Sequence, residues 1–95
     1  MFVILVQYIK DIQEVDKYLI AHRDYLDTGY QKDYLMASGP QNPRTGGVLL
    51  SQLRDRKLLD AFLEHDPFYI HGIASYQMIE FTPVKYHPLL SSIVN

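Results

Sequence analysis

The order of strand-like and helix-like segments constrains the fold of this chain more than any other feature. Residues 2–9 form an apolar, β-rich run of strand length. Further strands are predicted over 34–38, 47–53 and 73–82. Helical patterns separate the first strand from the second and the third from the fourth, so the predicted order is β-α-β-β-α-β.

The first helix is predicted from its cap and its apolar stripe. Asp11, followed three residues later by Glu14, is typical of a helix start. Gly29 predicts the end of the helix. The stripe at helical spacing consists of Val15, Leu19, His22 and Leu26.

The second helix is predicted to begin near Asp55 and to end before Asp66 and Pro67, because the residue before a proline disfavours helical backbone. Its expected apolar face is made of Leu58, Leu59, Phe62 and Leu63.

This order predicts an α+β fold of the ferredoxin-like type, with a four-stranded antiparallel sheet and both helices on one face. The length of 95 residues, without repeats or linkers, predicts a single domain over 1–95, with 84–95 as a C-terminal extension. One face of the sheet is left uncovered. A second copy of the chain is the expected cover, so a homodimer, or a higher homo-oligomer, is predicted, with the apolar residues of 84–95 at its interface.

Composition excludes several classes of function. The absence of cysteine excludes disulfides, thiolate metal sites and thiol nucleophiles. A net charge of −2 argues against a nucleic-acid partner bound through bulk positive charge. The run 2–9 is too short to span a bilayer and lacks the features of a signal peptide, so no membrane partner and a cytoplasmic location are expected.

His22 occupies a position where the helical stripe calls for an apolar residue, so its side chain is expected to point toward the sheet. One interpretation is a core histidine bonded to a backbone carbonyl. The other is a general acid or base, because imidazole titrates close to neutral pH.

Asp66 is the best candidate for a partner of His22. Helices on one face of a sheet approach each other, and a carboxylate on one ring nitrogen would fix the tautomer and stabilise the imidazolium. The alternative is that Asp66 caps a new helical turn that begins at Pro67. Among other acidic residues, Asp24 and Asp27 do not share a helix face with His22, and Asp33 is a lesser alternative.

Ser38 begins a run rich in glycine and proline that ends at Gly47. The run is typical of a hairpin connection and does not match a phosphate-binding loop. Alternatively, the Ser38 hydroxyl and nearby backbone N–H groups hold a polar group of a substrate, and Arg44 pairs with an anion. The spacing of His65, His71 and His87 matches no zinc signature, so neither a metal nor a cofactor is predicted.

Three segments together resemble the YciI-like (YCII-related) proteins, from residue 2 to about residue 83. They are the H-x-x-Y-L motif that starts at His22, the S-G-P-Q-x-P-R-x-G-G motif that starts at Ser38, and the D-P-F motif that starts at Asp66. The resemblance implies a dimeric α+β barrel of ferredoxin-like chains. It also implies a catalytic His–Asp pair, matching His22 and Asp66, and a pocket that includes Ser38 and Gly39.

Some members of this family are associated with the breakdown of chlorinated aromatics by loss of HCl. The family often carries a basic residue shortly before the histidine. This chain departs from that pattern, because position 19 is Leu19 and position 21 is Ala21. Arg23 and Arg44 are the remaining candidates for holding an anionic group.

The leading hypothesis is a small-molecule acid/base enzyme of isomerase, dehydrohalogenase (lyase) or hydrolase type. His22 would transfer a proton and Asp66 would orient it. Tyr25 and Phe68 would form apolar walls, with Ser38 and the Gly39 backbone as a polar anchor. The alternatives are a non-enzymatic dimer that binds a small metabolite and a purely structural dimeric module.

Overall fold

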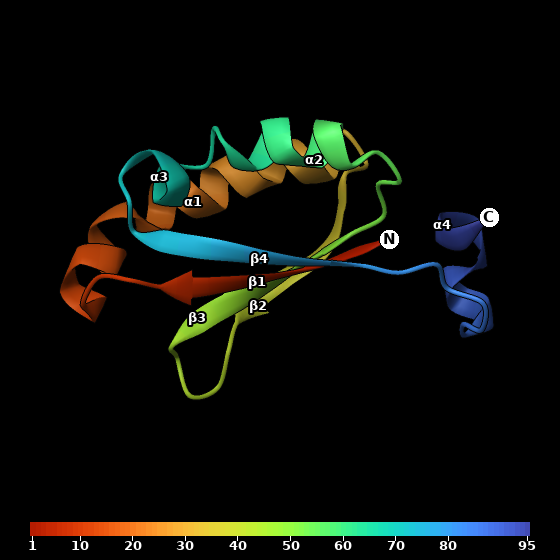
Figure 1. Cartoon of the computed structure of the whole chain (residues 1–95), viewed down its shortest axis with the longest axis horizontal. Helices are drawn as coiled ribbons and strands as arrows, with labels where there is room; N and C mark the ends of the chain where they lie inside the picture. Colours follow the sequence, from red (N-terminus) through yellow and green to blue (C-terminus); the bar gives the residue numbers. More distant parts are fainter.

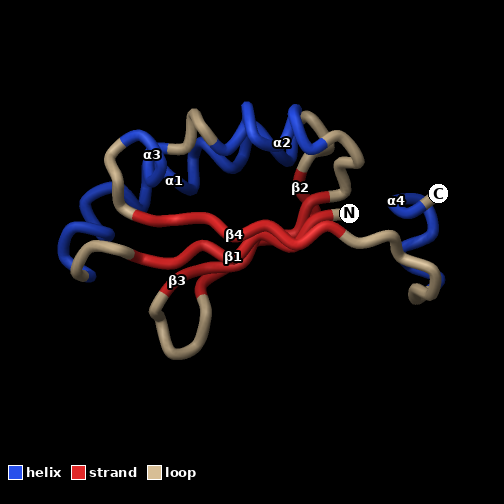
Figure 2. Tube along the Cα trace, in the orientation of Figure 1, coloured by secondary structure: helices blue, strands red, loops and turns tan.

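The chain folds into a four-stranded antiparallel sheet with helices on one face, in a computed structural model that describes all residues from Met1 to Asn95. The strands lie in the order β2-β3-β1-β4. The elements in chain order are β1 (Phe2–Tyr8), α1 (Ile12–Gln31), β2 (Leu35–Pro40), β3 (Gly46–Ser51), α2 (Arg56–Leu63), α3 (Pro67–Ile70), β4 (Ala74–Glu80), the 3-10 turn η1 (Pro88–Leu90) and α4 (Ser91–Val94). Figure 2 shows the strands as one layer, with α1, α2 and α3 on one side of it.

This architecture confirms the predicted ferredoxin-like α+β fold. β1 pairs antiparallel with both β3 and β4, which places it inside the sheet. The predicted strands differ from the observed ones by a few residues at their ends. The predicted order also lacks α3, a single turn that begins at Pro67.

The core lies between the sheet and the layer formed by α1, α2 and α3 (Figure 1). Side chains alternate across a strand, so every second residue of β1 enters this core, namely Phe2, Ile4 and Val6. The helices contribute Val15, Leu26, Leu59, Phe62, Leu63 and Phe68.

α1 begins as predicted but does not end at Gly29. The Asp11 side chain accepts a hydrogen bond from the Glu14 backbone N–H at 3.0 Å. The helix ends at Gln31, and Asp33 takes the left-handed conformation with φ of 61°. The Tyr34 N–H donates to the Gly29 carbonyl at 2.8 Å and the Asp33 N–H to the Tyr30 carbonyl at 3.1 Å, as in a Schellman motif.

Gly29 has a packing role instead. It is buried, and a Cβ at this position would lie 2.6 Å from Cζ of Phe62 on α2. The absence of a side chain therefore lets Phe62 pack directly against α1. A pattern that identifies Gly29 as a stop signal misses this contact between distant parts of the chain.

α2 begins at the predicted place. The Asp55 side chain accepts from the Lys57 N–H at 2.9 Å, and Leu59, Phe62 and Leu63 are buried. Leu58 departs from the expected apolar face, because it is 39% exposed.

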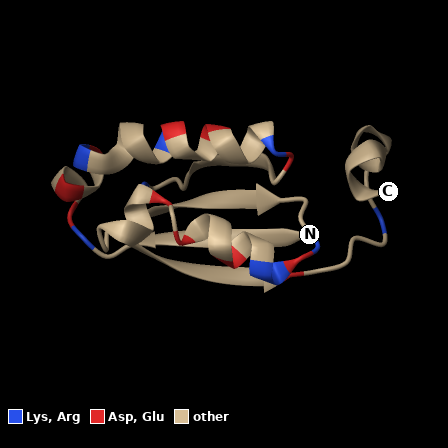
Figure 3. Cartoon of the chain, turned by 90° about the horizontal axis from the view of Figure 1, so that it is seen from above, with Lys and Arg blue, Asp and Glu red and all other residues tan.

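The outer face of the sheet is free of charged side chains and no helix covers it (Figure 1). Figure 3 shows the charged residues mainly on the helices and connecting segments. By strand alternation and register, the outward positions of β1, β3 and β4 are Val3, Leu5, Gln7, Val48, Leu50, Ser75, Gln77 and Ile79.

Residues 84–95 extend beyond the end of the sheet, and none of them is buried (Figure 1). Two apolar side chains of this extension are nearly fully exposed, Val84 at 87% and Leu89 at 83%. None of the helices has the length and apolar character needed to cross a bilayer.

Candidate functional site

His22 and Asp66 form a buried pair between α1 and the start of α3. The Nδ1 atom of His22 lies 2.8 Å from Oδ1 and 2.9 Å from Oδ2 of Asp66. The Asp66 side chain is fully buried and that of His22 is 10% exposed. The histidine is therefore bonded to a carboxylate, and the core histidine bonded to a backbone carbonyl is not what the structure contains.

Asp66 also caps α3. Its Oδ1 accepts a hydrogen bond from the Phe68 N–H at 3.0 Å, and Pro67 occupies the start of the helical turn. The two interpretations of Asp66 from sequence, a helix cap and a partner of His22, are thus true together. One carboxylate joins the turn of α3 to the middle of α1.

Tyr76 on β4 supplies a further donor to this carboxylate, with its hydroxyl 2.9 Å from Oδ2 of Asp66. Burial and the neighbouring Asp66 charge raise the pKa of Tyr76 far above its usual range, so the phenol stays protonated and donates. The donors on Asp66 are therefore His22 Nδ1–H, the Phe68 N–H and the Tyr76 hydroxyl. They compensate the cost of burying this carboxylate.

The other nitrogen of His22, Nε2, has no hydrogen-bond partner within the chain. The imidazole lies flat against the Phe68 ring, with centroids 3.9 Å apart and an interplanar angle of 3°. Every side-chain polar atom that is buried in this chain has a hydrogen-bond partner, so Nε2, which has none, is not one of the buried atoms. Nε2 is thus accessible from outside. A carboxylate only accepts hydrogen bonds, so Nδ1 carries the proton that points at Asp66. In the neutral imidazole the lone pair is then on Nε2.

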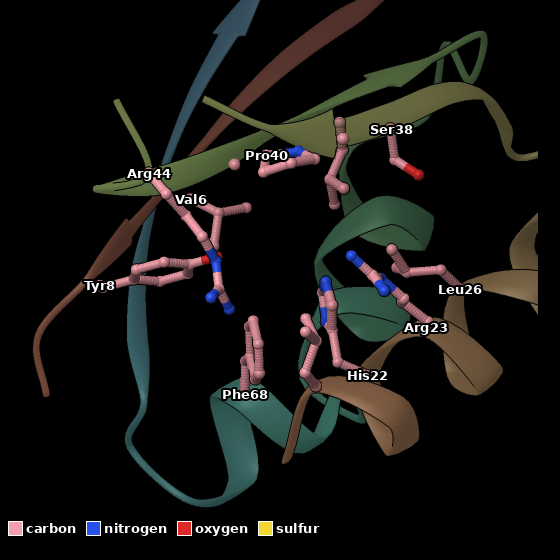
Figure 4. Close-up of a pocket in the computed structure, with 13 residues that line it drawn as sticks. Val6, Tyr8, His22, Arg23, Leu26, Ser38, Pro40, Arg44 and Phe68 are labelled. Atoms are coloured by element: carbon pink, nitrogen blue, oxygen red, sulfur yellow. The ribbon is translucent and has the colours of Figure 1, made fainter. Parts of the chain in front are cut away.

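A cavity of about 160 Å³ lies beside His22 (Figure 4). A cavity of ~150 Å³ accommodates a benzene molecule, so this one has room for a single six-membered ring. Its lining residues come from β1, α1, β2, the β2–β3 connection, β3 and α3: Val6, Tyr8, Leu19, His22, Arg23, Leu26, Ser38, Gly39, Pro40, Arg44, Gly47, Leu49 and Phe68.

Four of the residues proposed from sequence to bind a substrate lie at this cavity: Ser38, Gly39, Arg44 and Phe68. The Ser38 hydroxyl shares a hydrogen bond of 2.6 Å with the Tyr30 hydroxyl. Arg44 donates to Asp16 at 2.6 Å, and its guanidinium lies 5.8 Å from the centre of the Tyr8 ring. That hydrogen bond to Asp16 raises the pKa of Arg44 further.

Tyr25 does not reach the cavity. Its hydroxyl donates to the Phe62 carbonyl at 2.6 Å, and its ring stacks on Phe62 with centroids 4.9 Å apart. Tyr25 lies three residues after His22 on α1, and its side chain packs against α2, whereas that of His22 contacts α3. Burial raises the pKa of Tyr25. The prediction that Tyr25 forms a wall of the cavity is wrong, because Tyr25 is not among the lining residues.

The remaining acidic and histidine candidates lie elsewhere. Neither Asp24, Asp27 nor Asp33 forms an ion pair with His22. His65 is bonded to the Ala61 carbonyl at 2.9 Å, and His71 stacks on Tyr18 with centroids 4.2 Å apart.

Sequence reasoning missed two aromatic residues of the site, Tyr8 and Tyr76. A signal exists for Tyr8, because it has the same parity along β1 as the buried Ile4 and Val6. Tyr76 likewise alternates onto the inner face of β4. Its contact with Asp66 depends on the packing of α3 against β4, which no local pattern reveals.

Comparison with known proteins supports both the fold and the family. A family model described as the YCII-related domain matches residues 1–82, which confirms the resemblance seen in the sequence. Among solved structures, the 5-chloro-2-hydroxyhydroquinone dehydrochlorinase TftG from Burkholderia phenoliruptrix AC1100, in complex with 2,5-dihydroxybenzoquinone, is similar with a TM-score of 0.69. The alignment has 19% identity and covers 85% of this chain and 93% of the other, so it shows the fold alone. Comparison with curated proteins by sequence finds no match.

Proposed function

The chain belongs to the YCII-related domain family, and on this premise we propose that it is a small-molecule acid/base enzyme in which Nε2 of His22 transfers a proton. The observation that carries the proposal is the buried His22–Asp66 pair, whose free ring nitrogen is accessible at a cavity of single-ring size.

Each member of the pair has a defined role. Asp66 holds the proton of His22 on Nδ1, so that Nε2 is the basic atom. When Nε2 takes a proton from the substrate, the adjacent carboxylate stabilises the imidazolium that forms. Stacking on Phe68 fixes the plane of the ring, which reduces the reorganisation needed before proton transfer.

Among the reaction types that suit such a base, we favour elimination of HCl from a chlorinated ring, because the similar structure is that of a dehydrochlorinase. In this step Nε2 removes a proton from the substrate. The electron pair of the broken bond shifts into a new double bond, and chloride leaves with the electrons of the carbon–chlorine bond. The imidazolium then returns its proton to solvent. Isomerisation and hydrolysis would use the same first proton transfer.

Proton transfer is testable before the substrate is known. The ring C–H groups of 2,5-dihydroxybenzoquinone exchange with D₂O when an acid and a base protonate and deprotonate the ring carbon. We expect the protein to accelerate this exchange, measured by loss of the ring proton signal, by about 10²–10⁴-fold over buffer, the range for a positioned acid or base.

The matched variants are His22→Asn and His65→Asn. Asn at position 22 retains a donor toward Asp66 but has no basic nitrogen, so the acceleration should disappear. His65 lies on the surface, bonded to the Ala61 carbonyl, and its replacement should leave the rate unchanged. If the quinone binds but exchanges at the rate of buffer, the chain is better described as a non-enzymatic module that binds a small metabolite in this cavity.

We also propose that the chain forms a homodimer through the outer face of its sheet. This face carries Val3, Leu5, Val48, Leu50 and Ile79 and no charged residue, and Ile79 is 46% exposed. A group of partly exposed apolar side chains without a charged neighbour on the same face is typical of an interface.

Light scattering after gel filtration tests the dimer. Leu5→Glu places a charge at the centre of the outer face and should produce monomers, because an unpaired charge is costly to bury. Ile20→Glu changes an α1 side chain that is 75% exposed on the opposite side and should leave the mass unchanged. A monomeric parent protein at all concentrations would contradict the proposal. The cytoplasmic location expected from the sequence stays a prediction.

A further inference from the structure

Arg23 presents an unpaired positive charge at the mouth of the cavity. It follows His22 directly on α1, it is exposed, and it is one of the residues that line the cavity. It takes part in none of the ion pairs of the chain, whereas Arg44 and Arg56 do. Figure 4 shows the Arg23 side chain beside His22, on the cavity side of α1.

Arg44 reaches the same cavity from the opposite side, from the connection between β2 and β3 (Figure 4). Its charge is already balanced in part by Asp16, at 2.6 Å. The two guanidinium groups therefore differ. Arg44 is held by a carboxylate and by the Tyr8 ring, while Arg23 forms no ion pair within the chain.

The cavity also has an apolar part, formed by side chains from β1, α1, β3 and α3. Val6, Leu19, Leu26, Leu49 and Phe68 form its inner surface, and the volume of about 160 Å³ accommodates one ring with small substituents. An apolar interior with charge at the rim orients a molecule that has an apolar body and one charged end. Because Arg23 and Arg44 are positively charged, the charged end that they attract is an anion.

We propose that this site takes a single-ring compound with an anionic oxygen group, such as a carboxylate or an acidic enol, and that Arg23 selects it. This inference rests on the proposed function, because it names the substrate class of that same site. The ring lies against Phe68, the anionic group faces Arg23, and the bond to the transferred proton faces Nε2 of His22. Arg23 is here a specificity-determining residue, and the proton is moved by His22.

The size of the effect follows from the exposure of Arg23. A guanidinium binds a carboxylate with two parallel hydrogen bonds, but an exposed ion pair is weakened by water. We therefore expect a preference of about fivefold for an anionic ring over its neutral counterpart, a preference that falls as salt is added.

Benzoate and benzamide form a matched pair of probes, because they have nearly the same shape and differ in charge. Binding of each is followed by ¹H–¹⁵N NMR of the full chain, at low and at high salt. Benzoate should bind about fivefold more tightly than benzamide at low salt, with shifts at the Arg23 side chain and at the amides of Ser38 and Gly39.

Three variants separate a specific contact from bulk charge. Arg23→Gln should bring the affinity for benzoate down to that for benzamide and leave benzamide unaffected. Arg23→Lys retains the charge without the planar fork and should keep only part of the preference. Arg56→Gln removes an arginine on α2, paired with Asp60 at 3.2 Å, and should change neither affinity.

The proposal is overturned if benzoate binds no better than benzamide, if neither binds at millimolar concentration, or if Arg23→Gln keeps the preference. His22→Asn separates this test from that of the proposed function. It should still prefer benzoate, since Arg23 is intact, while losing the proton exchange. If His22→Asn keeps the proton exchange of the parent, the proposed function fails. If the exchange depends on His22 but the parent shows no preference for benzoate, the proposed substrate class fails and the proposed function stands.

Discussion

At the scale of the residue, one carboxylate connects folding with the proposed chemistry. Asp66 caps α3 through the Phe68 N–H and holds Nδ1 of His22 with the same oxygen, Oδ1. The cap fixes the carboxylate, and the carboxylate then fixes the imidazole. Positioning of the proposed base thus comes from an ordinary helix start, with no strained backbone required at either residue.

Asp66→Asn should move the ring proton of His22. An Asn side chain keeps the cap, because its oxygen accepts from the Phe68 N–H, but its NH₂ group can donate to Nδ1. The proton then resides on Nε2, which loses its lone pair. We expect the two ring nitrogens to exchange their characteristic ¹⁵N shifts and the catalysed proton exchange to fall toward the rate in buffer, because a wrong tautomer removes the base.

Asp24→Asn is the matched control for this experiment, since Asp24 lies on α1 close to His22 in sequence but forms no ion pair with it. It should leave the ¹⁵N shifts of His22 unchanged. An Asp66→Asn protein that keeps the parent tautomer would show that the carboxylate does not determine the protonation of the ring.

Tyr76 should make the protein sensitive to alkaline pH. Its pKa is raised in the folded chain, while in the unfolded chain it stays near its usual value of about 10. Below that pH both states keep the proton and the stability is full. Above it the unfolded state loses its proton first, so the free energy of unfolding decreases by up to about 1.4 kcal/mol per pH unit for this group.

Urea unfolding of Tyr76→Phe at neutral and alkaline pH checks the effect. Loss of the hydrogen bond to Asp66 should lower the stability at neutral pH by about 1–2 kcal/mol. The alkaline decrease should then be less steep than in the parent. Tyr86→Phe, in the exposed extension, should keep the parent slope, and an equal slope in Tyr76→Phe would contradict the assignment.

At the scale of the element, local patterns predict the helices and strands well and the contacts between them poorly. Asp11 and Asp55 cap the predicted helices, because a cap depends on residues a few positions away. The packing role of Gly29 cannot be predicted from neighbouring residues in this way. Its packing against Phe62 joins α1 to α2, and only the folded chain brings the two residues together.

Gly29→Ala should destabilise the protein although alanine favours a helix. Alanine gains about 1 kcal/mol over glycine inside a helix. Here the added Cβ would lie 2.6 Å from Cζ of Phe62, so the ring or the helix must move. Overpacking of a core costs about 1–3 kcal/mol. We expect a net decrease in the free energy of unfolding, measured with urea.

Phe62→Leu provides the control for that prediction, because a smaller side chain removes the overlap. Gly29→Ala should be less harmful, or stabilising, when it is combined with Phe62→Leu. A double-mutant cycle with no coupling energy would show that the two residues do not compete for space.

The candidate site was predictable to the extent that it depends on helix periodicity. His22 stands out because it interrupts an apolar stripe, and Asp66 because it precedes a proline at the end of a helix. The site residues Tyr8 and Tyr76, which the sequence did not reveal, receive their positions from the packing of separate elements. Tyr25 was assigned to the cavity wrongly, because periodicity places a side chain on a helix face but does not say which neighbour it contacts.

At the scale of the whole molecule, two apolar surfaces have no partner within the chain. One is the outer face of the sheet, and the other is the extension 84–95, in which Val84 and Leu89 are almost fully exposed. The family match ends at residue 82, just before this extension. Its position beyond the core suggests that it contributes to assembly rather than to the fold.

A chain that ends at Pro83 tests this division of roles. No residue of 84–95 is buried, and the hydrogen bond from Arg54 to the Val94 carbonyl is exposed, so the deletion removes little from the core. In dilute solution we expect the free energy of unfolding to change by less than about 1 kcal/mol. The dimer should dissociate at higher concentration than that of the full chain, as followed by sedimentation equilibrium. If instead the truncated chain is less stable by more than this amount while its dimer dissociates at the same concentration as that of the full chain, the extension stabilises the fold, and the interface lies on the sheet alone.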